Sequence, residues 1–143
     1  MRLLWFALLT GCAAYQPGSF NDGQPFGGQR LTLGCIDLAI ERRVDLTDAA
    51  VLDYQFGNRC TTPAPIDLAS VVVVGRTRGG QERRLAPYDP DRQLQTLQLD
   101  GRRSGREAIA YPSKEWLAQL CVDAGSLVQA TTPQWACVGE VMP

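Results

Sequence analysis

The sequence predicts an all-β fold, an antiparallel β-sandwich with at most one short helix near residues 113–120. Three observations support this fold class. Apolar and polar residues alternate over roughly six to eight short stretches, turn signals recur about every 10 residues, and helical periodicity is nearly absent. These features favour two packed antiparallel sheets over a helical or mixed domain.

The predicted strands follow one another along the whole domain. In the first strand the apolar positions switch face around Gly34, where a β-bulge is expected. An unbroken β-branched run over 71–74 is typical of a strand buried on both faces or of a buried sandwich core. Turn signals separate the strands. We expect them over residues 31–43, 51–56, 66–74, 82–85, 93–99, 106–111 and 121–128, the last interrupted at Gly125.

Helix signals are confined to one place near the end of the chain. Ser113 is expected to cap one or two helical turns over residues 113–120. Beyond the last strand, residues 129–143 are mostly polar and predict a loose tail.

Charge and composition exclude several classes of function. The net charge is −1, so nucleic acid is not an expected partner. The chain has no histidine, which removes the commonest general base and the commonest transition-metal ligand. We therefore expect no metal and no cofactor.

Five cysteines divide into one near the N-terminus and four within the predicted domain. An even number in an exported chain predicts two disulfides, and four cysteines allow three pairings. The register of the first hairpin places Cys35 opposite residue 59 or 60, which favours Cys35–Cys60 and leaves Cys121–Cys137 by elimination.

The N-terminus contains an address signal. Arg2 precedes a short apolar run over 3–8, and Leu9-Thr10-Gly11-Cys12 follows it. The run is shorter than the about 20 residues that span a bilayer as a helix. This order closely resembles the lipobox of bacterial lipoproteins, although an ordinary signal peptide with an incidental cysteine is the alternative.

The lipoprotein resemblance implies that Cys12 becomes an acylated N-terminus with a thioether-linked diacylglycerol. Ala13, which stands where aspartate would favour the inner membrane, implies an outer-membrane location. The expected organisation is a signal peptide, then a lipidated N-terminus with a flexible spacer that contains Tyr15, then the sandwich and a disulfide-stapled tail, over residues 1–11, 12–29, 30–128 and 129–143.

The domain itself resembles the immunoglobulin-like accessory domains of secreted bacterial proteins. The resemblance depends on a Y-x-F-x-N strand and on an aromatic residue before a proline. It involves Tyr54, Phe56 and Asn58, residues 68–74, Asp100-Gly101 and residues 108–112. It implies a sandwich and a packing role for these residues.

Two groups of charged residues are candidates for binding. Asp89 and Asp91 flank a proline as calcium ligands can, but a calcium site needs six or more oxygens, so solvated turn residues are favoured. Arginines around two turns could bind anionic headgroups or polysaccharide, but solvated arginines that nearby acids partly neutralise are favoured, because the net charge is near zero. They are Arg76, Arg78, Arg83 and Arg84, and then Arg102, Arg103 and Arg106.

The sequence leaves two hypotheses of function. The first is a non-catalytic, lipid-anchored sandwich that binds an envelope protein or a polysaccharide. The alternative is a small hydrolase or sugar-active enzyme, with two carboxylates about 5–10 Å apart in one cleft. Its candidate acids are Asp53, Asp89, Asp91 and Glu107. Asp53 or Glu107 could instead be a buried carboxylate that is paired with Arg106 or Arg59.

Overall fold

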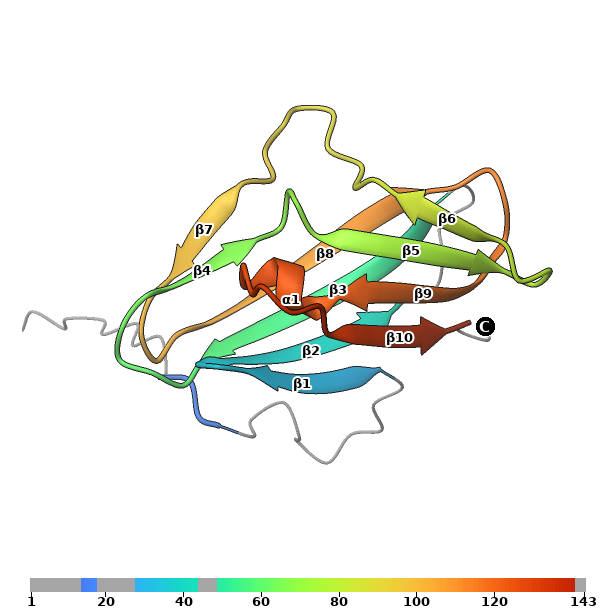
Figure 1. Cartoon of the computed structure of the whole chain (residues 1–143). Helices are drawn as coiled ribbons and strands as arrows, with labels where there is room; N and C mark the ends of the chain where they lie inside the picture. Colours follow the sequence, from blue (N-terminus) through green and yellow to red (C-terminus); the bar gives the residue numbers. More distant parts are fainter. Residues whose placement is uncertain (1–13, 18–27, 44–48, 141–143) are drawn as a thin grey trace, which may run out of the picture.

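A computed structural model describes residues 14–17, 28–43 and 49–140 of the chain (Figure 1). In these residues, ten strands form two four-stranded antiparallel sheets and one two-stranded ribbon. The two larger sheets face each other across an apolar interior, so the predicted antiparallel β-sandwich is confirmed.

The strands of each sheet come from distant parts of the chain. The first sheet has the order β1-β2-β3-β8, over Gln29–Leu33, Ile36–Arg42, Ala49–Asn58 and Ser104–Pro112. The second has the order β10-β9-β5-β6, over Trp135–Gly139, Leu117–Asp123, Val72–Thr77 and Glu82–Leu85. The ribbon pairs β4 (Ala64–Asp67) with β7 (Thr96–Leu99).

This strand order is that of an immunoglobulin-type sandwich. In such folds the strands A, B and E face a sheet with the order G, F, C and C′. Here β2-β3-β8 face β10-β9-β5-β6 in the same chain order. The arrangement differs in its disulfides, because neither of them joins the two sheets.

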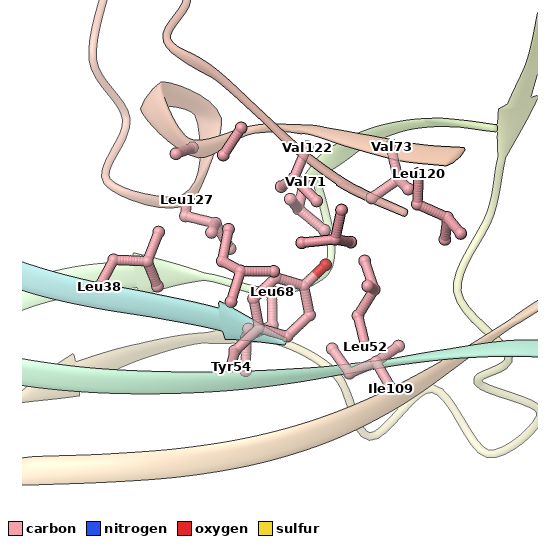
Figure 2. Close-up of a cluster of buried hydrophobic side chains, with 14 of the residues drawn as sticks. Leu38, Leu52, Tyr54, Leu68, Val71, Val73, Ile109, Leu120, Val122 and Leu127 are labelled. Carbon is pink, nitrogen blue, oxygen red and sulfur yellow. The ribbon is translucent and has the colours of Figure 1, made fainter. Parts of the chain in front are cut away.

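Alternating side chains of both sheets fill the interior (Figure 2). Tyr54 and Tyr111 lie on the inner face of neighbouring strands, and their hydroxyl oxygens are 2.6 Å apart. Burial raises the pKa of Tyr111 to about 12 and raises that of Tyr54 well above its usual value, so both phenols stay neutral. Val73, Leu120 and Leu127 pack opposite them without exposure to solvent.

Two predicted strands differ from those in the structure, the first in its extent and the second in its burial. Residues 31–43 are not one bulged strand, because Gly34 adopts a φ of 58° and turns the chain into the β1-β2 hairpin. The β-branched run over 71–74 is not buried on both faces. Val73 is fully buried, whereas Val72 and Val74 are half-buried on the outer face of β5.

The predicted helix near residues 113–120 is wrong. Leu117 already begins β9, and the single helical turn in the described part of the chain is α1 (Ala124–Leu127). A register shift between β5 and β9 explains the misleading pattern. Arg76 pairs with Gln119 and Thr77 pairs with Leu117, so Ala118 is an extra residue. This bulge points Leu117 and Leu120 to the same face, at the spacing of a helix.

The predicted tail is ordered over residues 135–139. These residues form β10, which pairs with β9 and buries Ala136 and Val138 in the core. Asp123 caps the α1 turn, and its Oδ1 accepts hydrogen bonds from the backbone N–H groups of Gly125 and Gln134, both at 3.0 Å. These two bonds tie the turn to the segment that leads into β10.

Both predicted disulfides are present. Cys35 and Cys60 have Cα atoms 5.4 Å apart, and they join the β1-β2 turn to the residues after β3. Cys121 and Cys137 lie directly opposite each other on β9 and β10, with Cα atoms 4.0 Å apart. Each bridge therefore ties together parts of the chain that already lie at or beside the same sheet.

Candidate functional site

A groove of about 640 Å³ opens between β8, β7 and the segment that links β6 to β7. In Figure 1 this linking segment projects as a loop at the top of the molecule. The wall of the groove includes the side chains of Tyr88, Gln93, Gln95 and Thr96. Tyr88 is 64% exposed, more than any other large hydrophobic residue in the part of the chain that the structure describes.

The loop beside the groove is held at both ends by hydrogen bonds. The backbone N–H of Tyr88 donates to the carbonyl of Ala110 on β8, at 2.8 Å. The Asp89 carboxylate accepts bonds from the backbone N–H groups of Gln93 at 2.7 Å and Leu94 at 3.0 Å. Asp89 therefore closes the loop through backbone N–H groups four and five residues further on, and both of its oxygens are engaged.

Three of the four predicted carboxylates line this groove. They are Asp89, Asp91 and Glu107, and the last two are exposed to solvent. Glu107 lies opposite Tyr54 in the sheet, so its side chain is on the same face of β8 as those of Ile109 and Tyr111. Among the described residues, no group of three or more histidine, cysteine, aspartate or glutamate side chains could hold a metal ion.

The groove combines an exposed aromatic ring with amides, a hydroxyl group and two solvated carboxylates. Aromatic rings stack on apolar ligand faces, while the polar groups donate and accept hydrogen bonds along the same surface. This set suits an extended ligand rich in hydroxyl groups. The sequence identified the Asp89 and Asp91 pair as one local cluster. Glu107 was not placed with them, because it reaches the groove from β8, through strand pairing.

Asp53 lies elsewhere, on the outer face of β3. Its side chain is 1% exposed because the side chains of Arg43 and Arg106 cover it. Arg43 Nη2 lies 2.9 Å from Asp53 Oδ2, and Arg106 donates from Nε at 3.0 Å and also from Nη2. The predicted pairing with Arg106 is confirmed, and Asp53 has no access to the groove.

The pKa of Asp53 is lowered in the folded protein. Burial by itself would raise it, but the hydrogen bonds and charges of Arg106 and then Arg43 outweigh that effect. Because the folded pKa lies below the unfolded one, the ion pair stabilises the protein above about pH 4, and this stabilisation is lost as pH falls through the folded pKa.

Asp53→Asn is expected to lower the free energy of unfolding at pH 7 by about 1–2 kcal/mol, because charge-assisted hydrogen bonds are lost. Between about pH 4 and pH 2 the stability of the variant should fall less than that of the wild type, because the variant has no carboxylate at position 53 to protonate. Urea unfolding at several pH values measures both effects. The exposed Asp91→Asn is the control, and an equal pH dependence in wild type and Asp53→Asn would contradict this assignment.

The arginines around the β5-β6 hairpin are largely neutralised, as the sequence favoured. Arg76 pairs with Glu82 at 2.8 Å, Arg78 with Glu140 at 3.2 Å, and Arg83 with Glu115 at 3.1 Å. These exposed pairs contribute little stability. They leave this hairpin with little excess positive charge for an anionic ligand.

Sequence reasoning missed a second site, where Tyr15 contacts the first sheet. Tyr15 was assigned to the spacer, but it is 4% exposed. Its hydroxyl donates to Asp37 Oδ2 at 2.6 Å, and its backbone N–H donates to the carbonyl of Arg102 at 2.6 Å. Its ring lies on Gly57, where an added Cβ would be 2.1 Å from Tyr15 Cζ.

Asp37 is the centre of this contact. Its Oδ1 accepts a bond from Thr32 Oγ1 at 2.9 Å and lies 3.1 Å from Arg59 Nε, a contact with ion-pair distance but without hydrogen-bond geometry. Arg59 Nη2 also donates to the carbonyl of Gly34. A glycine within a strand signals close approach of another group, so Gly57 was the available sequence clue.

Cys12, the predicted lipidation residue, lies outside the described residues, as does the predicted signal peptide over 1–11. Within the described residues, no helix has the length and apolar character needed to cross a membrane.

Comparisons with known proteins inform the fold only. No family model matches the chain, and no curated protein matches it. Among solved structures, the yjhA protein from Bacillus subtilis is similar, with a TM-score of 0.50 and 11% sequence identity. The match covers 78% of this chain and 97% of that chain. The two chains thus share an overall arrangement at an identity that shows no common activity.

Proposed function

We propose that this protein is a lipid-anchored, non-catalytic lipoprotein of the bacterial cell envelope that binds a glycan in the groove beside Tyr88. The observation that carries the anchoring is Leu9-Thr10-Gly11-Cys12 after a short apolar run. Diacylation supplies a stable anchor, because burial of two acyl chains contributes roughly 0.8 kcal/mol per CH₂. The outer membrane is the proposed location, since Ala13 follows the cysteine.

Acylation is tested by metabolic labelling with an alkyne fatty acid. The wild-type protein is expected to carry the label and to sediment with membranes, because Cys12 would be the acceptor. Cys12→Ala removes the thiol and should abolish labelling, because the other four cysteines form the two disulfides. Equal labelling of the two forms would exclude Cys12 as the lipidation site.

Glycan binding is supported by the chemistry of the groove. Tyr88 offers an exposed ring, and Gln93, Gln95 and Thr96 offer donors and acceptors within the same groove. Sugar rings present an apolar face and a hydroxyl-rich rim, which this combination matches. The two solvated carboxylates favour a neutral or cationic glycan over an acidic one.

Tyr88→Ala is expected to lower glycan affinity about tenfold, since an anchoring aromatic residue contributes more than 1 kcal/mol. Calorimetric titration with a neutral glycan, chitotetraose, measures this, and acidic deacylated lipopolysaccharide glycans are expected to bind more weakly because of the two carboxylates. Trp135→Ala is the matched control, because Trp135 is 50% exposed and does not line the groove. Equal loss in both variants would argue against the groove as the site.

The enzymatic alternative retains one favourable observation, which is that Asp91 and Glu107 line the same groove. Such a pair would act as acid and base on a glycosidic bond if the two carboxyl groups lay about 5–10 Å apart. New reducing ends released by wild type, and not by Asp91→Asn or Glu107→Gln, would favour a hydrolase over a binding protein.

A further inference from the structure

We propose that Tyr15 fixes the orientation of the domain on the membrane, with the β7-β8 turn against the lipid surface and with Arg102 and Arg103 on anionic phospholipid headgroups. This inference rests on the proposed acylation of Cys12. It replaces a freely tethered domain with one that lies on the bilayer in one orientation.

The first step is the short distance along the chain. Tyr15 is the third residue after Cys12, and three residues span at most about 11 Å. A flexible spacer over 12–29 would instead hold the domain at an r.m.s. distance of about 20–25 Å. The docking of Tyr15 therefore brings the nearby surface of the domain to the headgroup region.

The second step is the firmness of that docking. The Tyr15 phenol donates to the Asp37 carboxylate, and its backbone N–H donates to the carbonyl of Arg102. Its ring occupies the space above Gly57, where any larger residue would clash. These contacts involve backbone, side chain and ring together, so the residue is held in position and direction.

The third step is the chemistry of the adjacent surface. Arg102 and Arg103 are exposed in the turn that accepts the Tyr15 N–H, and the Arg102 N–H donates to the carbonyl of Cys60 at 2.9 Å. In the described part of the chain Arg102 makes no ion pair, whereas Arg76, Arg78 and Arg83 at the other hairpin do. Guanidinium groups bind phosphate oxygens in a bidentate manner.

Arginine footprinting tests this orientation. The acylated protein is inserted from outside into preformed phosphatidylcholine–phosphatidylglycerol vesicles and treated with phenylglyoxal, and modification of each arginine is followed by mass spectrometry. Arg102 and Arg103 are expected to react about fivefold more slowly in wild type than in Tyr15→Ala. Arg83 and Arg84, an adjacent arginine pair on β6, should react at the same rate in both.

Gly57→Ala provides a second way to release Tyr15, because the added methyl would occupy the position of its ring. It should expose Arg102 and Arg103 as Tyr15→Ala does, and far-UV circular dichroism checks that both variants stay folded. Pure phosphatidylcholine vesicles should reduce the wild-type protection, since anionic headgroups are the proposed ligand.

The outcomes separate this inference from the anchoring itself. Acylated wild-type protein whose Arg102 and Arg103 react as fast as in Tyr15→Ala would overturn the fixed orientation and leave the anchor intact. Protection that is equal with and without phosphatidylglycerol would overturn the headgroup contact. A purified protein whose mass lacks the acyl chains would overturn both proposals before any footprint is read.

Discussion

Asn58→Ala is expected to lower the free energy of unfolding by about 2–4 kcal/mol, since the hydrogen bonds of one buried side chain are lost. Asn58 is fully buried at the end of β3. Its Nδ2 donates to the carbonyls of Thr62 at 2.8 Å and Leu99 at 3.0 Å, and its Oδ1 accepts from the N–H of Cys60 at 3.0 Å. Alanine would leave these backbone groups unsatisfied in the interior.

Urea unfolding of the two forms measures this loss. Gln98→Ala is the matched control, because Gln98 is an exposed amide on β7, and its change should stay within about 0.5 kcal/mol. An Asn58→Ala effect below about 1 kcal/mol would mean that water or rearranged backbone replaces the lost bonds. It would also remove the packing role that the Y-x-F-x-N pattern assigns to this residue.

The Asn58 site shows why the fold class was predictable from sequence. Tyr54, Phe56 and Asn58 alternate along one strand, and this period places all three on the inner face before any partner strand is known. Turn residues and alternation are local signals. They therefore predicted the strands and the all-β class, and the hairpin register predicted the Cys35–Cys60 bridge.

The errors have physical causes that a local pattern does not contain. Ala118 bulges out of β9, so Leu117 and Leu120 share one face at helical spacing. A glycine in a bulge and a glycine in a turn both change the face on which the apolar side chains alternate. Only the pairing of Leu33 with Ile36 shows that Gly34 lies in a turn between two strands. In each case the decisive information lies in a partner strand far away in the sequence.

The candidate sites depended even more on tertiary structure. Asp89 and Asp91 were found as a local pair, but the groove also needs Glu107 from β8 and the exposed ring of Tyr88. Tyr15 seemed to belong to a polar spacer, because nothing near it in sequence resembles a strand. Its partners, Asp37 and the turn at Arg102, come from two other parts of the chain.

The two proposed surfaces are compatible with one arrangement at the membrane. In Figure 1 the loop beside the groove lies at the top of the molecule, whereas the segment over 14–17 lies at the lower left. A domain held to the bilayer through Tyr15 would therefore point that loop away from the lipid. The groove would then face the compartment in which an envelope glycan is encountered.

Loss of the Cys121–Cys137 bridge is expected to loosen residues 129–140 before the first sheet opens. The bridge closes a loop with a sequence separation of 16, which corresponds to about 3 kcal/mol in the chain-entropy model. β10 is an edge strand that pairs only with β9 among the described strands. The remaining apolar anchors of the segment are chiefly Ala136 and Val138.

The Cys35–Cys60 bridge is the internal comparison, because hydrogen bonds already hold both of its ends. The N–H of Arg59 donates to the carbonyl of Cys35 at 2.8 Å, and Asn58 Oδ1 accepts from the N–H of Cys60 at 3.0 Å. We expect hydrogen exchange of Cys121→Ser/Cys137→Ser to rise mainly over 129–140, and that of Cys35→Ser/Cys60→Ser to rise little over 29–60. Exchange that rises first over 29–60 would show that hydrogen bonds at this end depend on the bridge, and would reverse the assigned order of opening.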